Sequence, residues 1–126
     1  PFLISTSVIG ILAQRLVRVI CPKCKATYTP SAEVLKDLHF DRPLELYRGT
    51  GCMHCKNSGY VGRIGIFELL VIDESIKNMI VSRMPVHEIR KKAMEAGMRT
   101  LYEDGIEKIK NGITTAEEVL RVIEET

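Results

Sequence analysis

The chain has 126 residues, of which 45% are hydrophobic and 27% are charged, a composition that excludes the disordered and fibrous classes. Its net charge is only +2 and basic residues are spread among acidic ones, so nucleic acid is not indicated as the main partner. No apolar stretch approaches the roughly 18 residues that span a bilayer, so we expect any membrane association to be peripheral or through a partner.

The first twenty residues are rich in Ile, Leu and Val. Val8, Ile11 and Leu12 have the spacing of a short helix, after which the pattern favours a strand that leads to Cys21. The chain begins Pro-Phe-Leu-Ile, without an initiator methionine or a signal peptide. We therefore expect it to be a piece of a longer protein.

Two Cys-x-x-Cys pairs enclose a loop with structure of its own. They account for all the cysteines of the chain, Cys21, Cys24, Cys52 and Cys55. Inside the loop, Thr29 and Pro30 resemble a helix cap followed by proline at the first helical position, which predicts a short helix. A brief extended segment is expected to turn at Gly49 and Gly51 into the second pair.

A dense apolar and β-branched run follows the second pair, from residue 64 to residue 72. This run predicts a buried strand. We expect it to pair with the strand before Cys21, so that the cysteine loop is an excursion between two neighbouring strands.

Helix signals dominate the last part of the chain. Asp73 is expected to cap one helix, and Pro85 to open a second that ends at Gly97. Thr100–Glu103 and Thr115–Glu118 each have the pattern of a capping box before a further helix. The inward side chains of the helix after Pro85 are expected to be Val86, Ile89 and Ala93. The expected fold class is α+β, a small stapled loop inserted between two paired strands and followed by a bundle of short helices.

Four thiolates in two such pairs favour one tetrahedral zinc ion, because each Cys-x-x-Cys turn presents two sulfurs on one side. A closed shell of four cysteines leaves no open position for water or substrate, so the expected role is structural. Two disulfides or buried thiol pairs are the competing interpretation, and iron in the same shell is less favoured. A thiol oxidoreductase would need one reactive cysteine of low pKa. Without secretory signals, the cysteine usage favours the cytoplasm.

Other candidate residues are weaker. His54 lies within the second pair, but with four sulfurs available we expect it to be exposed. Arg15, Arg18 and Arg63 flank the expected strands, and solvated edge positions are favoured over phosphate contacts. The chain contains no phosphate-binding loop of the form G-x-x-x-x-G-K-[ST], so we expect it to catalyse nothing by itself.

Several motifs occur in an order that resembles the C-terminal region of the type II secretion and type IV pilus assembly ATPases. They are Ala13-Gln14-Arg15-Leu16-Val17-Arg18, the two cysteine pairs, Gly59-Tyr60-x-Gly62-Arg63-x-Gly65-Ile66-x-Glu68-Leu69-Leu70, Gly97-Met98-x-Thr100-Leu101 and Gly112-x-Thr114-Thr115-x-Glu117-Glu118-Val119. The resemblance covers essentially the whole chain.

This resemblance implies a hexameric ATPase ring of the bacterial cytoplasm that is peripheral to the inner membrane through its partners. The implied partners are neighbouring subunits and the inner-membrane platform proteins. ATP and Mg²⁺ would be bound only by the full-length parent, because the family's nucleotide motifs are not in these residues. The resemblance also suggests that Arg15 and Arg18 contact nucleotide or a neighbouring subunit. Pilus retraction ATPases lack the cysteines, which makes retraction an unsuitable assignment.

The expected division of the chain follows from this likeness. Residues 1–20 would end the ATPase core, residues 21–58 would form the tetracysteine zinc subdomain, residues 59–72 would return to the core, and residues 73–126 would form a helical subdomain. The alternative function is a free-standing zinc-ribbon adaptor that binds protein or nucleic acid, which predicts basic and aromatic residues clustered on the metal loop.

Overall fold

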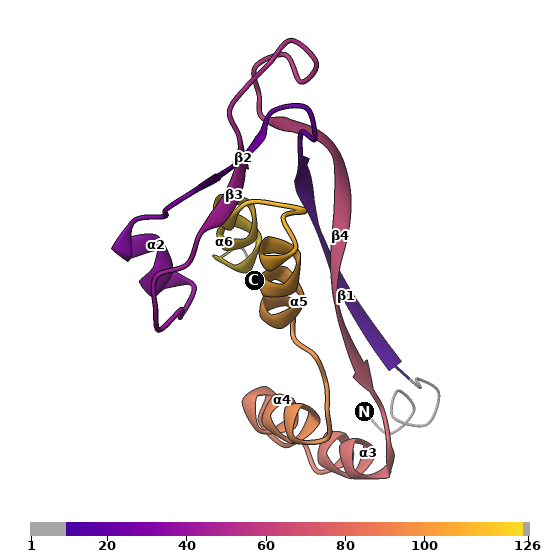
Figure 1. Cartoon of the computed structure of the whole chain (residues 1–126). Coiled ribbons are helices and arrows are strands. Elements are labelled where there is room, and N and C mark those ends of the chain that lie inside the picture. Colours follow the sequence, from indigo (N-terminus) through magenta and orange to yellow (C-terminus); the bar gives the residue numbers. More distant parts are fainter. Residues whose placement is uncertain (1–9, 125–126) are drawn as a thin grey trace. The chain divides into compact units, whose positions relative to one another are not determined.

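A computed structural model describes residues 10–124, which form two compact units (Figure 1). Residues 10–14 and 67–101 make up the first unit. Residues 15–66 and 102–124 make up the second. None of the helices in the described part of the chain is long and apolar enough to cross a membrane. The division of the chain into four segments expected from the sequence stays a prediction.

A two-stranded ribbon contributes to both units. Strand β1 (Gly10–Ile20) pairs with β4 (Tyr60–Val71). The N–H of Cys21 donates to the carbonyl of Gly59 at 2.8 Å, while a Cβ atom on Gly10 would lie 3.4 Å from the carbonyl oxygen of Leu70, so the strands run antiparallel. The predicted pairing of the two strands around the cysteine loop is confirmed.

The prediction of a short helix near the start of the chain is wrong for the residues that the structure describes. Ile11 and Leu12 belong to β1, and Val8 lies outside the described residues. Three apolar residues at helical spacing are a weak signal, and pairing with the long partner strand outweighs it.

The cysteine loop contains a small hairpin and a helix. Strand β2 (Lys25–Tyr28) pairs antiparallel with β3 (Leu46–Gly49), with Lys25 opposite Gly49 and Tyr28 opposite Leu46. Helix α2 (Ala32–Asp37) lies in the segment between them. Its cap is Ser31, whose hydroxyl accepts from the N–H of Val34 at 3.3 Å, and not the predicted Thr29. Ser31 is three residues before Val34, the distance at which a side-chain cap reaches a helical N–H.

The first unit is built from the ends of the ribbon and two helices. Asp73 caps α3 (Glu74–Val81) as predicted, its carboxylate accepting from the N–H of Ile76 at 2.9 Å. Helix α4 (Val86–Glu95) follows Pro85 and is closed at Gly97, which has a φ of 104°. The core of this unit consists of Ile72, Ile76 and Ala93.

One predicted core residue of α4 is wrong. Val86 is 80% exposed, whereas Ile89 packs against the core and Ala93 is buried. Val86 is the first residue of α4. Within this helix, contact with the core starts about one turn later, at Ile89.

The second unit joins the cysteine loop to helices α5 (Leu101–Lys110) and α6 (Ala116–Glu124). A Cβ atom on Gly105 of α5 would lie 2.6 Å from Cγ1 of Val119 on α6, so glycine allows the two helices to approach closely. The Tyr102 hydroxyl donates to the carbonyl of Leu38 at 2.5 Å and ties α5 to the loop. The buried core of this unit is Leu38, Leu46, Ile109, Ala116 and Val119.

Candidate metal centre

The four cysteine sulfurs converge at the end of the β2–β3 hairpin. Each of the four sulfur atoms lies within 4.8 Å of the other three. Cys21 Sγ is 3.8 Å from Cys52 Sγ, Cys24 Sγ is 3.8 Å from Cys55 Sγ, and Cys52 Sγ is 3.7 Å from Cys55 Sγ. Residues 31 positions apart in sequence therefore meet because β1 pairs with β4 and β2 pairs with β3.

These distances fit a tetrahedral metal ion and not a pair of disulfides. Four sulfurs placed about 2.3 Å from a tetrahedral zinc ion lie about 3.8 Å from one another. A disulfide would need sulfurs about 2.05 Å apart, and all four cysteines are free thiols. The four cysteines could hold a metal ion, and their donor set is the all-sulfur one of structural zinc sites.

Backbone amides form a second layer around the sulfurs. The N–H of Gly51 donates to Cys24 Sγ at 3.3 Å. The N–H groups of Cys52 and Gly59 donate to Cys55 Sγ at 3.3 and 3.2 Å. Such donors stabilise thiolate charge and orient the ligands of a metal centre.

The amides act unequally on the thiols of Cys24 and Cys55. Loss of contact with water raises the pKa of Cys55, but the N–H groups of Gly59 and Cys52 outweigh it and lower the pKa to about 6. Loss of contact with water raises the pKa of Cys24 to about 11, with the N–H of Gly51 opposing it. Cys55 therefore ionises at a lower pH than Cys24, and a metal ion that binds Cys24 as a thiolate must displace its proton.

Two glycines bring the backbone segments of the centre together. A Cβ atom on Gly49, at the end of β3, would lie 2.2 Å from the carbonyl oxygen of Gly59. A Cβ atom on Gly59 would lie 2.8 Å from the carbonyl oxygen of Gly49. The sequence pattern predicts a sharp turn at Gly49, whereas in the structure Gly49 permits this close approach of two backbone segments.

His54 is exposed on the second cysteine loop, as predicted. It is not among the residues that converge with the sulfurs in the described part of the chain. The four-cysteine set predicted from the sequence is thus the set that the fold brings together.

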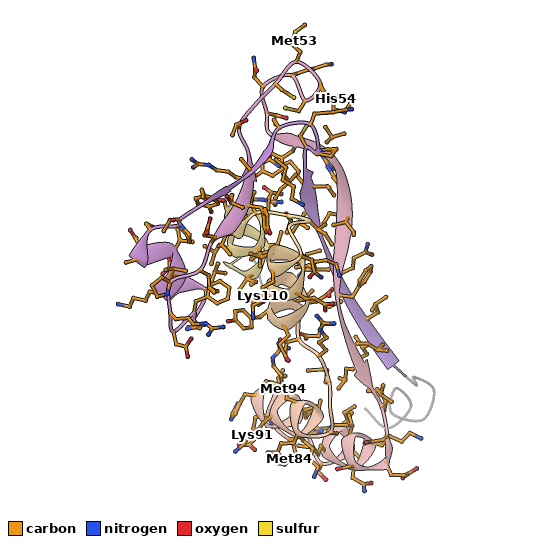
Figure 2. All side chains as sticks on the ribbon, viewed as in Figure 1. Met53, His54, Met84, Lys91, Met94 and Lys110 are labelled. Carbon is orange, nitrogen blue, oxygen red and sulfur yellow. The ribbon has the colours of Figure 1, made fainter. Side chains whose placement is uncertain are left out.

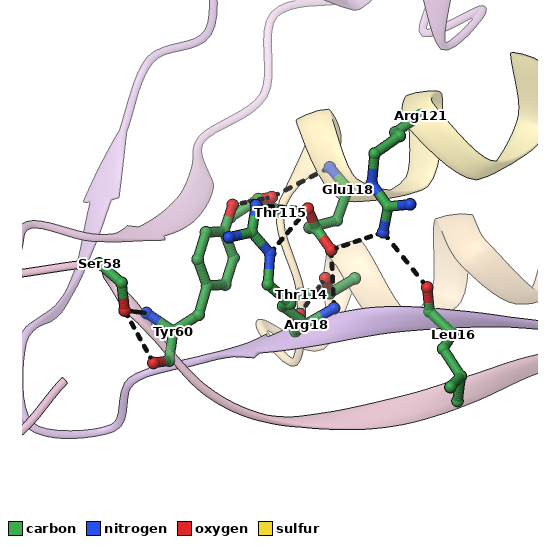
Figure 3. Close-up of polar contacts among 8 residues, drawn as sticks. All are labelled: Leu16, Arg18, Ser58, Tyr60, Thr114, Thr115, Glu118 and Arg121. Atoms are coloured by element: carbon green, nitrogen blue, oxygen red, sulfur yellow. Dashed lines mark hydrogen bonds and ion pairs between the residues drawn. The ribbon is translucent and has the colours of Figure 1, made fainter.

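A second polar cluster surrounds the buried carboxylate of Glu118, between β1 and the start of α6 (Figure 3). Glu118 is 2% exposed and accepts from Nη2 and Nε of Arg18 at 2.8 and 3.1 Å, and from the backbone N–H of Arg18 at 2.7 Å. Arg121 donates from Nη2 to the same carboxylate at 3.1 Å and to the carbonyl of Leu16 at 3.3 Å. Burial raises the pKa of Glu118, but the bonds from Arg18 and Arg121 outweigh it and lower the pKa to about 2.

Neighbouring side chains complete this cluster. The guanidinium of Arg18 stacks over the ring of Tyr60 at 4.1 Å, and the Tyr60 hydroxyl lies 2.7 Å from Oγ1 of Thr115. The Thr114 hydroxyl donates to the carbonyl of Arg18 at 2.7 Å. The cluster fastens the turn before α6 to strand β1 and supports the strand that leads to Cys21.

The second predicted capping box is therefore confirmed only in part. The Thr115 hydroxyl accepts from the N–H of Glu118 at 3.2 Å, as the pattern requires. The Glu118 side chain does not reach back to the helix start but binds Arg18, 100 residues away in sequence. Arg18 thus has a partner within the chain. Arg15, also on β1, is half-buried.

A third polar cluster, which the sequence patterns did not predict, lies in the first unit. Glu68 of β4 accepts from Nη1 and Nη2 of Arg90 on α4 at 2.5 and 2.8 Å, and from the N–H of Leu101 at 2.9 Å. The bonds from Arg90 lower the pKa of Glu68, against the opposing effect of burial. The sequence signal for this residue is a single acid in the apolar run from residue 64 to residue 72.

Comparison with known proteins identifies the family. The family model described as "Type II/IV secretion system protein" matches residues 1–121. The type II secretion system ATPase E of Vibrio cholerae is 46% identical over 132 residues, covering 100% of this chain and 25% of the relative. The type IV pilus assembly ATPase PilB of Thermus thermophilus is 46% identical, covering 98% of this chain and 14% of the relative.

The type II secretion system protein E of Pseudomonas aeruginosa is 42% identical, with 99% of this chain and 25% of the relative covered. The chain spans a quarter or less of the length of these relatives. With the family model matched over nearly the whole sequence, the chain belongs to the type II/IV secretion system protein family, which includes type II secretion and type IV pilus assembly ATPases.

Proposed function

We propose that Cys21, Cys24, Cys52 and Cys55 bind one structural zinc ion, and that the chain is the zinc-binding C-terminal region of an ATPase that powers type II secretion or type IV pilus assembly. The observation that carries the first part is the convergence of the sulfurs within 4.8 Å, at the spacing of a tetrahedral shell. Family membership supports the second part and disfavours the free-standing adaptor.

The zinc ion is proposed to hold the cysteine loop in place and not to act in catalysis. Cys21 and Cys24 sit where β1 passes into β2, and Cys52 and Cys55 sit between β3 and β4. An ion bound by all four would therefore close both connections between the ribbon and the hairpin. A filled shell of four sulfurs has no open position for substrate, which fits a structural role.

The proposed parent is a hexameric ring in the cytoplasm, placed at the inner membrane by its platform partners. In that assembly this chain has a structural and interaction role, and ATP with Mg²⁺ belongs to the remainder of the parent. The Glu118 pair favours Arg18 as a structural residue, since its guanidinium is already engaged. A contact of Arg15 and Arg18 with nucleotide or a neighbouring subunit stays a proposal for the assembled parent.

Metal analysis of the purified chain tests the zinc site. We expect one zinc per chain by mass spectrometry of the metal, and a fall in Tm when a chelator removes it. Cys55→Ser should lose zinc, whereas His54→Ala is the matched control from the same loop and should retain it. A chain that folds without metal and keeps its Tm in chelator would overturn the proposal, as would equal loss of zinc in both variants.

An ATPase assay tests the proposal that ATP hydrolysis belongs to the rest of the parent protein. The chain alone should hydrolyse no ATP, while a full-length parent protein should hydrolyse it and lose activity when the cysteine loop is destabilised by Cys55→Ser. ATP turnover by the isolated chain would contradict the assignment of nucleotide chemistry to the rest of the parent.

A further inference from the structure

A zinc ion bound by four thiolates carries a net charge of −2, because its two positive charges offset only half of the four negative ones. The sulfurs of this chain would hold that charge partly away from water. Cys21 and Cys55 are buried, and Cys24 and Cys52 are half-buried. Burial of charge is costly unless hydrogen bonds or opposite charges compensate it. The surroundings of the four cysteines are therefore expected to supply such compensation.

The chain around the cysteines is basic and free of acids. Residues 21–32 and 46–67 contain no acidic side chain. The acids of the loop all belong to the intervening segment, residues 33–45. The basic side chains of the two acid-free segments are Lys23, Lys25, Arg48, Lys56 and Arg63. The local sequence thus supplies the sign of charge that a zinc centre of four thiolates needs.

The register of the β2–β3 hairpin keeps the acids of the loop away from the cysteines. Lys25 is opposite Gly49 at the end next to the cysteines, and Tyr28 is opposite Leu46 at the end next to α2 (Figure 1). The acidic segment, residues 33–45, belongs to the connection at that second end. It is therefore not placed to repel zinc-bound thiolates.

The five cations differ in how they are held. Lys25 and Arg48 lie over aromatic rings of the hairpin, at 4.9 and 4.6 Å, and Arg63 lies on β4. Lys23 lies inside the first Cys-x-x-Cys turn, and Lys56 directly follows the second. Both of these lysines are exposed and form no ion pair with any residue from 10 to 124. Their charges are therefore available to the cysteine turns.

Chain connectivity keeps both ammonium groups near the sulfurs. Lys23 and Lys56 each adjoin a cysteine, Cys24 and Cys55, and neighbouring Cα atoms are about 3.8 Å apart. Even a fully extended lysine side chain then leaves its Nζ atom within about 12 Å of that cysteine's Sγ atom. Charges at such a distance still attract one another, because the screening length is about 8–10 Å at moderate ionic strength.

The backbone at Lys56 is a second, independent observation. Its φ is 56°, a left-handed conformation that glycine adopts freely and that a residue with a Cβ atom rarely adopts. The turn is closed by the N–H of Lys56, which donates to the carbonyl of Met53 at 3.2 Å, and by the N–H of Asn57, which donates to the carbonyl of Cys52 at 2.8 Å. A lysine where the backbone favours glycine is accounted for if its charge has a function.

We propose that Lys23 and Lys56 are counter-charges of the zinc centre, which raise its affinity for zinc by offsetting the −2 charge of the ion and its four thiolates. This proposal rests on the zinc site of the proposed function. Neither lysine ligates the ion, because four sulfurs fill a tetrahedral shell. Met53 is 95% exposed and projects with His54 from the end of the second unit, so the turns are open to water (Figure 2). The effect of the lysines is therefore moderate and sensitive to salt.

Zinc affinity, measured by competition with a chelator at neutral pH, tests the proposal on the full chain. Lys23→Gln with Lys56→Gln should weaken zinc binding about tenfold at low ionic strength. Each lysine contributes about threefold, since it lies about 10 Å from a centre that gains one to two negative charges when zinc binds. Lys23→Arg with Lys56→Arg keeps both charges and should bind zinc within about twofold of the unmodified chain. Both pairs of variants retain a Cβ atom at residue 56, so backbone strain is the same in each.

The matched control is Lys36→Gln with Lys110→Gln, which removes the same charge elsewhere in the second unit. Lys36 is exposed on α2, and Lys110 lies over the ring of Phe40 at 5.8 Å, well separated from Met53 in Figure 2. The control pair should bind zinc within about twofold of the unmodified chain, because its charges are more than a screening length from the sulfurs.

Ionic strength separates a charge effect from a packing effect. The ratio of zinc affinities between wild type and the Lys23→Gln, Lys56→Gln pair should shrink from about tenfold to about twofold when sodium nitrate is raised from about 0.02 M to about 0.5 M. The effect of salt on the chelator is common to both proteins and cancels in this ratio. Loss of packing would leave the ratio unchanged.

Four results would overturn the counter-charge proposal. They are unchanged zinc affinity in the glutamine pair, equal weakening by the glutamine and arginine pairs, equal weakening by the control pair, and a ratio that salt does not alter. In each of these the wild-type chain still binds zinc, so the proposed function stands. A wild-type chain that binds no zinc refutes the proposed function and this proposal together.

Discussion

Replacing Glu118 by Gln should destabilise the second unit by about 2 kcal/mol at neutral pH. Its pKa of about 2, compared with an ordinary value of 4.5, corresponds to about 3 kcal/mol of stabilisation by the ionised form. The partner Arg18 side chain is 49% exposed, and solvent screening reduces this figure to about 2 kcal/mol. Glutamine keeps the size of the side chain, so the change reports mainly on charge.

The pH dependence has a definite sign. Because folding lowers the pKa of Glu118, its contribution is complete above the unfolded value near 4.5 and is lost as the pH falls toward about 2. The stability difference between wild type and Glu118→Gln should therefore shrink to well under half between pH 7 and pH 2.5. Loss of zinc at low pH should lower the free energy of unfolding of wild type and variant alike. It therefore cancels in the stability difference between them.

Urea unfolding followed by far-ultraviolet circular dichroism measures this difference at each pH. Glu117→Gln is the matched control, since Glu117 is exposed on the same turn of α6 and should change stability by less than about 0.5 kcal/mol. The reasoning is refuted if Glu118→Gln costs no more than Glu117→Gln, or if the difference from wild type is the same at pH 2.5 as at pH 7.

Three further substitutions test the packing around the two units. Gly49→Ala should destabilise the cysteine loop by about 2 kcal/mol and speed zinc loss to a chelator, because its Cβ would lie 2.2 Å from the carbonyl oxygen of Gly59. An unchanged rate of zinc loss would count against this close approach. Gly105→Ala should lower the Tm although alanine favours helix, since its Cβ would lie 2.6 Å from Val119, and a higher Tm would show that the helices can separate at little cost. Glu68→Gln should lower stability by about 1 to 2 kcal/mol in urea unfolding by weakening its bonds with Arg90, while the exposed Glu74→Gln should not; equal effects would deny Glu68 its role in the first unit.

The sequence was most informative where a local pattern carries its own chemistry. The cysteine spacing identified the four side chains that meet, and Asp73 identified a helix start, because both depend on residues a few positions apart. The pairing of β1 with β4 was also predictable, since both flank the cysteine loop and both are apolar.

The features that sequence reasoning missed depend on distant partners. Glu118 fits a local capping box, and nothing near it indicates that its carboxylate binds Arg18 across 100 residues. Gly49 resembles a turn glycine until Gly59 is placed against it.

X-ray absorption at the zinc edge, on the chain purified with its native metal, tests the central claim most directly. Four sulfur neighbours at about 2.3 Å, with no nitrogen or oxygen in the first shell, are the predicted result. A shell containing a nitrogen or oxygen ligand, or fewer than four sulfurs, would contradict the account of Cys21, Cys24, Cys52 and Cys55 as one closed structural site.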